Sequence, residues 1–167
     1  MVKPTFEGHK VREADRLFCE ADHKLQQGNN GAAFQMFLLG AKAGDPSSQL
    51  NVGYFYDRGI GVRQNKKTAI LWYTRAYRRG DAAAANNIGT IWRARGELRR
   101  ALSWFRRALK MGDDGANLSI AKLYVRRDRN SNRAVACLEQ VCRSNRVTEV
   151  DAEEAARLLK KLKKRRS

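Results

Sequence analysis

The chain has 167 residues, enough for one domain with a core of its own. Apolar residues make up 43% of it, a share that is ordinary for globular proteins and excludes disorder throughout. The charge is unusual, because 34 Lys and Arg stand against 17 Asp and Glu and give a net charge of +17. Such a charge attracts acidic proteins, nucleic acid or anionic lipid, or is simply an Arg-rich solvated surface.

The excess positive charge lies in the last two thirds of the chain. Residues 1–45 carry six basic and six acidic side chains, whereas residues 46–113 carry +10 and residues 114–167 carry +7. The first ten residues lack the apolar run of a signal peptide, and no stretch approaches the roughly 18 apolar residues of a membrane span. We therefore expect a cytoplasmic protein, with a signal peptide removed beforehand as an open alternative.

The cysteines are too few and too poorly spaced for a disulfide framework. We expect Cys19, Cys137 and Cys142 to be small buried apolar residues in a reducing compartment.

The sequence repeats itself. Gly44-Asp45, Gly80-Asp81 and Gly112-Asp113 each close an apolar stretch, the glycines lie 36 and 32 residues apart, and Asn145 takes the same position in a fourth copy. A period in this range predicts stacked helical hairpins, whose apolar faces combine into one core. Eleven residues before each mark lies an alanine, and seven before it a large apolar residue: Ala33, Ala69, Ala101 and Ala134, then Phe37, Tyr73, Phe105 and Leu138.

Taken in chain order, the elements begin with a flexible N-terminal arm over residues 1–10 and a first hairpin over residues 11–45. The second hairpin, 46–81, contains a long turn through Gly59 and Gly61, and the third, 82–113, turns tightly at Gly96. The fourth covers 114–146. A capping helix over 147–162 and a basic tail over 163–167 follow, and no segment alternates as a strand does.

Small residues on one helix are expected to face large residues on the next. Gly53 and Gly89 recur at the same position of the first helices, and aromatic residues recur at fixed positions around them. This regularity favours core packing of the aromatic rings over base stacking or carbohydrate binding.

The second unit carries a specific resemblance. Residues 50–62 read LNVGYFYDRGIGV, residues 67–76 read KTAILWYTRA, and Gly80-Asp81 follows. This pattern resembles the Sel-one-like repeat (SLR), a relative of the tetratricopeptide repeat. The third unit lacks the long turn and resembles a plain tetratricopeptide repeat, and the first and fourth are degenerate. The resemblance implies an all-α, right-handed α-solenoid of four SLR/tetratricopeptide-like hairpins plus the C-terminal capping helix.

In function, the resemblance implies a non-enzymatic adaptor or scaffold that binds another protein or an acidic peptide in its concave groove. In tetratricopeptide proteins the first helices line this groove, where Asn side chains clamp a peptide backbone and basic side chains hold a carboxylate or phosphate. The alternative is that these are ordinary solvated side chains. The corresponding positions here are Asn51, Tyr54, Arg58, Asn86, Asn87, Arg93, Lys122 and Arg126.

Nucleic-acid binding through a basic surface is a second hypothesis, although no recognised nucleic-acid module is present. Attachment of the tail to anionic lipid is a third and weaker one. A stripe of Arg75, Arg78 and Arg79 also precedes a helix end, where cations complement the helix dipole. The residues of the basic surface are Lys66, Lys67, Arg99, Arg100, Lys160, Lys161, Lys163, Lys164, Arg165 and Arg166.

The sequence offers no catalytic constellation. His9 and His23 match no metal-ligand spacing, and Gly59-Ile60-Gly61 lacks the strand and third glycine of a dinucleotide site. We therefore expect no enzyme, no cofactor and no metal. The expected partner is a protein, the expected origin is bacterial, and the oligomeric state stays open.

Overall fold

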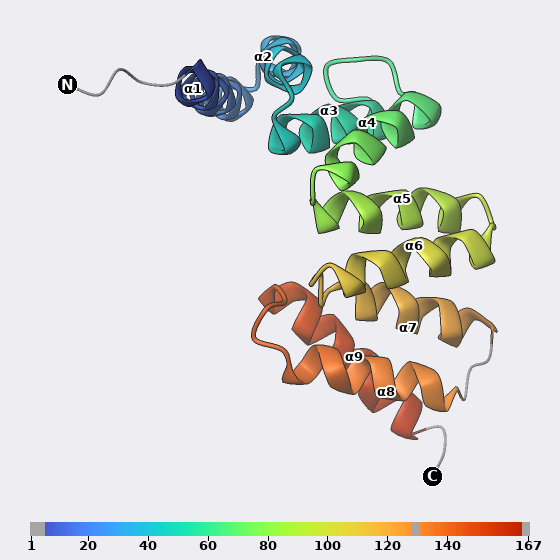
Figure 1. Ribbon diagram of the computed structural model, residues 1–167. Coiled ribbons are helices and arrows are strands. Elements are labelled where there is room, and N and C mark those ends of the chain that lie inside the picture. The colour runs from blue at the N-terminus through green and yellow to red at the C-terminus, as the bar shows by residue number, and fades with distance from the viewer. Residues whose placement is uncertain (1–5, 128–130, 165–167) are drawn as a thin grey trace. The chain divides into compact units, whose positions relative to one another are not determined.

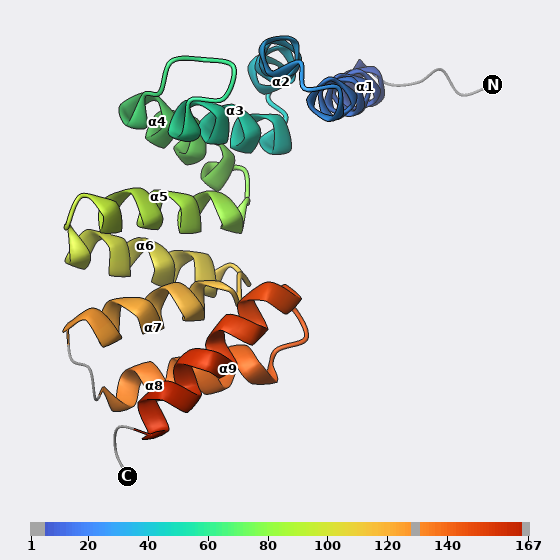
Figure 2. The same cartoon turned by 180° about the vertical axis from the view of Figure 1, so that it is seen from behind.

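The structure is a computed structural model that describes residues 6–127 and 131–164, with side chains from residue 13 onward. Within these ranges it contains nine helices and no strand (Figures 1 and 2). The all-α class predicted from the repeats is thereby confirmed. The chain forms two compact units, Met1–Asp81 and Ala82–Ser167. The first holds α1 (Phe6–Gln26), α2 (Asn30–Ala43), α3 (Pro46–Arg58) and α4 (Lys66–Arg78), and the second α5 (Ala82–Ala94), α6 (Leu98–Lys110), α7 (Ala116–Arg127), α8 (Asn132–Arg143) and α9 (Glu149–Lys164).

The Gly-Asp marks of the sequence join one hairpin to the next. Gly44 adopts φ 99° at the C-terminus of α2, and the amide of Asp45 donates back to the carbonyl oxygen of Gly40 at 3.1 Å. The Asp45 carboxylate then accepts from the amide of Ser48 at 2.6 Å and caps α3, with Pro46 in its first turn. One dipeptide therefore ends a helix and starts the next, which explains its recurrence.

Aromatic rings fill the core of the first unit. The ring of Phe37 meets those of Phe18 and Phe55 edge to face, with centroids 5.4 and 5.6 Å apart. Ala21 and Ala33 are fully buried beside them, because helices approach closely only where side chains are small. Each aromatic pair contributes about 0.5–1.5 kcal/mol beyond the area that it buries.

Each unit contains a close helix-to-ring contact made possible by glycine. A Cβ atom on Gly89 of α5 would lie 2.5 Å from Cε1 of Phe105 on α6, and one on Gly53 of α3 would lie 2.5 Å from Cδ1 of Tyr73 on α4. Phe105 and Tyr73 are fully buried. The predicted pairing of small with large residues is therefore present in both units.

The long turn of the second hairpin packs on the first. Gly61, at φ 62°, lies so close to α2 that a Cβ atom there would be 2.5 Å from the carbonyl oxygen of Asn30 and 2.9 Å from the amide of Gly31. Only glycine combines this positive φ with this closeness to another backbone.

In the second unit, α9 packs against α8 and crosses it obliquely in both views (Figures 1 and 2). Ala155 and Leu162 of α9 are buried against Leu138 and Val141 of α8 and Leu118 of α7. No helix in the described ranges is both long and apolar enough to span a membrane.

Several expectations from the sequence need correction. Helix α1 begins at Phe6, so residues 6–10 of the expected arm are helical, because each residue added to an established helix costs little once the first turn has formed. Helix α9 reaches Lys164, two residues into the expected tail. Cys19 and Cys142 are exposed, so they are not core residues, whereas Cys137 is half-buried and packs against the core of the second unit; all three thiols are free. Cys19 follows Phe18 by about 100° around α1, which turns it away from the core.

Candidate functional site

The predicted groove residues of the first unit lie on α3. Tyr54 is 41% exposed, and the guanidinium carbon of Arg58 lies 5.6 Å from its ring centroid. Asn51 is half-buried, and its Nδ2 donates to the carbonyl oxygen of Ser47 on its own helix at 3.0 Å. The pair of Tyr54 and Arg58 thus forms an open, cationic surface, whereas Asn51 has one of its two amide hydrogens already bonded.

In the second unit two of the predicted groove residues, Asn86 and Lys122, contact side chains on other helices. Ser119 Oγ of α7 donates to Asn86 Oδ1 of α5 at 3.2 Å. Lys122 Nζ of α7 forms an ion pair with the Glu154 carboxylate of α9 at 2.8 Å. Helices α5, α7 and α9 therefore line one face of this unit, and α9 supplies an acidic residue there that the sequence analysis did not include.

The other groove residues of this unit are less engaged. Arg93 is half-buried with its guanidinium carbon 6.0 Å from the Phe105 ring centroid, Asn87 is half-buried, and Arg126 is exposed. Neither arginine pairs with a carboxylate within the described part of the chain. Burial raises the pKa of the nearby Asp113 above its ordinary value, although hydrogen bonds from Asn86 and two backbone amides oppose the shift.

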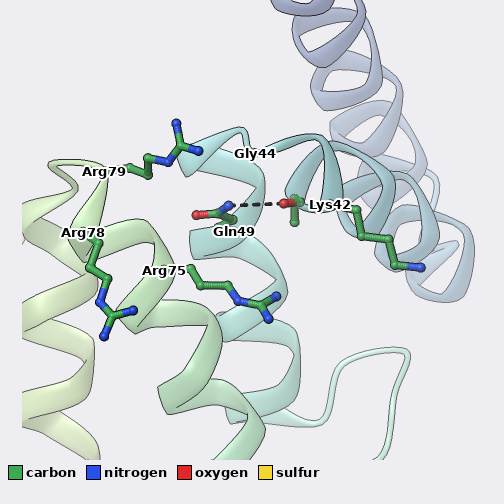
Figure 3. Close-up of a pocket in the computed structure, with 7 residues that line it drawn as sticks. Lys42, Gly44, Gln49, Arg75, Arg78 and Arg79 are labelled. Carbon is green, nitrogen blue, oxygen red and sulfur yellow. Dashed lines mark hydrogen bonds between the residues drawn. The ribbon is translucent and has the colours of Figure 1, made fainter.

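A hollow of about 420 Å³ in the first unit was not predicted from the sequence (Figure 3). Four cationic side chains and a buried glutamine surround it, and we call it the basic hollow. It combines the last turns of α2 and α4 with the first turn of α3. Its polar residues are Lys42, Gln49, Arg75, Arg78 and Arg79.

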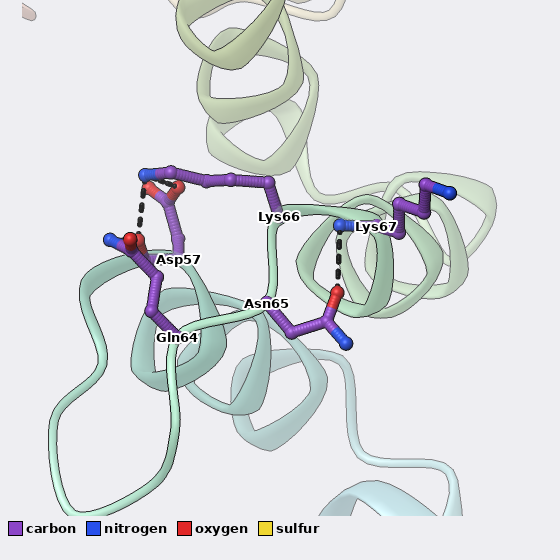
Figure 4. Close-up of polar contacts among 5 residues, drawn as sticks. All are labelled: Asp57, Gln64, Asn65, Lys66 and Lys67. Atoms are coloured by element: carbon purple, nitrogen blue, oxygen red, sulfur yellow. Dashed lines mark hydrogen bonds and ion pairs between the residues drawn. The ribbon is translucent and has the colours of Figure 1, made fainter.

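Lys66, predicted as part of a basic surface, has a structural role instead (Figure 4). Its Nζ lies 2.6 Å from both the carboxylate and the carbonyl oxygen of Asp57, whose side chain is only 11% exposed. Gln64 Nε2 donates to the same carbonyl oxygen at 2.8 Å, and Asn65 caps α4 through the amides of Lys67 and Thr68. Lys66 therefore closes the long turn and is not a free cation.

The rest of the basic surface is divided. Lys67, Arg99, Lys160 and Lys161 are exposed. The guanidinium carbon of Arg100 lies 4.8 Å from the Trp92 ring centroid, and Lys163 pairs with Glu139 at 3.1 Å. Lys164 is an exposed residue at the end of α9, and Arg165 and Arg166 lie outside the described residues.

No group of three or more His, Cys, Asp or Glu in the described ranges is placed to hold a metal ion. The described residues offer two cationic surfaces. One lies on the first helices, and the other is the basic hollow, whose cations come from the C-terminal ends of α2 and α4.

Comparison with known structures supports the fold assignment. The chain superposes on a protective antigen of uropathogenic Escherichia coli with an SLR fold, at a TM-score of 0.75 and 19% identity, over 95% of this chain and 35% of that one. A Sel1 repeat protein from Oxalobacter formigenes gives a TM-score of 0.66 at 20% identity, over 92% and 64%. A tetratricopeptide repeat protein from Parabacteroides merdae gives 0.64 at 18% identity, over 92% and 61%. These likenesses concern the fold alone.

The sequence match to a known protein covers only part of either chain. The chain is 41% identical over 56 residues to the chitin synthase regulator SKT5 of Saccharomyces cerevisiae, which is 34% of this chain and only 8% of that protein. The Sel1 repeat matches residues 24–45, 46–81 and 82–113. These three ranges make up more than half of the 167 residues, and they include the long turn and both glycine–ring contacts. The chain belongs to the Sel1 repeat family.

Proposed function

We propose that this protein is a non-enzymatic scaffold that binds an acidic segment of another protein on the first helices of its repeats. The observation that carries the proposal is the pair of Arg93 and Arg126, which stand on α5 and α7 without a carboxylate partner among the described residues. The Asn86–Ser119 hydrogen bond joins the same two helices at 3.2 Å. Fixed helices that carry unpaired guanidinium groups are suited to holding carboxylates.

Membership of the Sel1 repeat family supports the same class of function, because repeat arrays of this kind generally act as protein-interaction scaffolds. The net charge of +17 supports an acidic partner. A cytoplasmic location is part of the proposal, and the free thiols at Cys19 and Cys142 are typical of a reducing compartment.

Nucleic-acid binding remains a second candidate, supported by the exposed cations Lys67, Arg99, Lys160 and Lys161. The tryptophans argue against it. Guanidinium carbons of the chain itself lie over all three indole rings, at 4.3 Å for Trp72, 4.8 Å for Trp92 and 4.5 Å for Trp104. Base stacking on these rings would have to displace the arginines, whereas single-strand binding proteins present open aromatic faces.

The test is capture of partners from the native cell after nuclease treatment. The groove variant carries Asn87→Ala, Arg93→Glu and Arg126→Glu, and the control variant carries Arg99→Glu and Arg100→Glu, which changes the net charge by the same amount. We expect the groove variant to lose its protein partners and the control to retain them, as measured by quantitative mass spectrometry. Loss of capture in the control alone, or its disappearance on nuclease treatment, would support the nucleic-acid candidate instead.

A further inference from the structure

We propose that the basic hollow of the first unit is a second binding site, which takes a carboxylate together with a neighbouring backbone N–H from an acidic peptide segment. This inference rests on the proposed function in that it names a further contact for an acidic partner. The site shares no residue with the first-helix positions considered above: its arginines belong to α4, its lysine to α2 and its glutamine to the first turn of α3.

The cations of the hollow lack counter-charges. Lys42 comes from the last turn of α2, and Arg75, Arg78 and Arg79 from the last turn and C-cap of α4. None of the four forms an ion pair within the described part of the chain. A helix dipole favours a cation at its own C-terminus, but it does not explain why cations from two helix ends line one hollow of about 420 Å³.

Gln49 gives the hollow a second kind of recognition group. It is only 5% exposed, and its Nε2 donates to the carbonyl oxygen of Ala41 at 3.2 Å. A carbonyl oxygen can only accept, so this bond fixes which end of the amide is which, and Oε1 is the free end. Figure 3 shows the nitrogen of Gln49 at the hydrogen bond and the oxygen at the other end of the amide, on the side of Arg78 and Arg79.

Oε1 of Gln49 has no hydrogen-bond donor among the described residues. A buried acceptor left without a donor is costly, so a ligand that brings a donor to this point gains more than the bond itself. The residues around the hollow therefore include one buried acceptor beside several exposed guanidinium and ammonium donors, and a ligand reaches that acceptor by moving the side chains that cover it.

This combination favours a peptide over a nucleic acid. A phosphodiester offers oxygen acceptors and negative charge, and the Gln49 oxygen repels both. An acidic peptide offers a carboxylate, which a guanidinium fork binds through two parallel hydrogen bonds, and a backbone N–H only a few bonds away. A Glu or Asp residue in extended backbone thus satisfies the cations and the amide oxygen at once.

The test uses the full chain and a fluorescein-labelled peptide of six glutamates with a blocked C-terminus, followed by fluorescence anisotropy in 150 mM NaCl. The site variant is Arg78→Gln with Arg79→Gln, and its control is Arg99→Gln with Arg100→Gln, which removes the same charge from α6. We expect the site variant to bind about tenfold more weakly or worse, and the control to stay within about twofold of the wild type. Circular dichroism of both variants checks that these exposed substitutions leave the fold unchanged.

The acceptor role of Gln49 is tested on the ligand side. N-methylation of every backbone nitrogen of the hexaglutamate peptide removes the donors and keeps the charge, and we expect binding to fall by about fivefold or more. Equal losses in the two arginine variants would show diffuse electrostatic attraction and would overturn the proposal. Tighter binding of a six-nucleotide thymidine oligomer, lost in the same site variant, would overturn it in favour of a phosphate site.

The groove variant separates this inference from the proposed function. Asn87→Ala with Arg93→Glu and Arg126→Glu changes no residue of the basic hollow, so the N-methylation effect and the effect of Arg78→Gln with Arg79→Gln should persist in that background. If they persist while cellular partners are lost, both proposals hold, and if partners are retained, only the proposed function fails.

Discussion

Gly89→Ala tests the packing that joins α5 to α6. The added Cβ would lie 2.5 Å from Cε1 and 2.6 Å from Cδ1 of Phe105, where ordinary contacts are 3.4–4 Å, so the ring or the helix must move by about 1 Å. Phe105 is fully buried, so its ring can move only if the side chains packed around it move as well. Overpacking of this kind costs about 1–3 kcal/mol, and the better helix propensity of Ala offsets about 1 kcal/mol, which leaves a net loss of up to about 2 kcal/mol.

The measurement is urea unfolding followed by circular dichroism, with Gly31→Ala as the matched control. A Cβ on Gly31 of α2 meets no described atom within 4 Å, so the same substitution there should stabilise by about 0.5 kcal/mol. Phe105→Leu added to Gly89→Ala should recover part of the loss, with a coupling energy of about 0.5–3 kcal/mol between the two sites. If Gly89→Ala proves as stable as Gly31→Ala, or the two substitutions are additive, the close contact is not what selects glycine.

Three further predictions concern polar groups. Lys66→Met should lower the free energy of unfolding in urea by about 1–3 kcal/mol, because it leaves the nearly buried Asp57 carboxylate without its cation. Lys67→Met on the exposed surface should change the free energy of unfolding by no more than about 0.5 kcal/mol, and equal losses in the two variants would refute the structural role of Lys66. Tyr73 is buried, which raises its pKa above the ordinary value, and its hydroxyl has no hydrogen-bond partner among the described residues. Tyr73→Phe should therefore unfold at the same or a higher urea concentration than the wild type. A clear loss of stability would contradict the absence of a hydrogen bond from this hydroxyl. Burial also raises the pKa of Asp113 above its ordinary value of 3.8, so between these two pKa values the folded protein binds more protons than the unfolded chain, and the contribution of Asp113 to stability falls as the pH rises. Asp113→Asn should therefore remove this pH dependence from the free energy of unfolding measured between pH 4 and pH 7. An unchanged pH dependence would assign it to other groups.

The fold could be predicted because the same local pattern recurs at a regular spacing, and this recurrence indicates which helices pack together. The Gly-Asp marks end and begin helices through contacts a few residues apart, so the caps around Gly44 and Asp45 follow from residue type alone. The contact of Gly89 with Phe105 follows from opposing small and large positions in one hairpin. Helix α1 begins at Phe6, whereas the sequence of residues 6–10 shows no helical period of apolar residues from which this start could be predicted.

The polar sites were harder to predict, for a physical reason. The partner of Lys66 depends on the path of the turn between α3 and α4, which helical spacing does not describe. Part of the basic hollow could have been predicted from the sequence, because Lys42 and Arg78 each lie two residues before a Gly-Asp mark and therefore occupy equivalent last turns of α2 and α4. The burial of Gln49 had no such trace, since a glutamine near a helix start is ordinarily solvated.

The seating of Gly61 on the backbone of Asn30 bears on where this protein tolerates engineering. A long connection is usually the place to insert a label or expect a protease cut, since loop tips accept change readily. Here the tip touches the preceding hairpin, and the bonds from Gln64 and Lys66 to Asp57 hold its return, so an inserted tag would push the two hairpins of the first unit apart. The short connection at Gly96, where an added Cβ meets no described atom within 4 Å, is the better point of attachment for a fluorophore or split-reporter fragment.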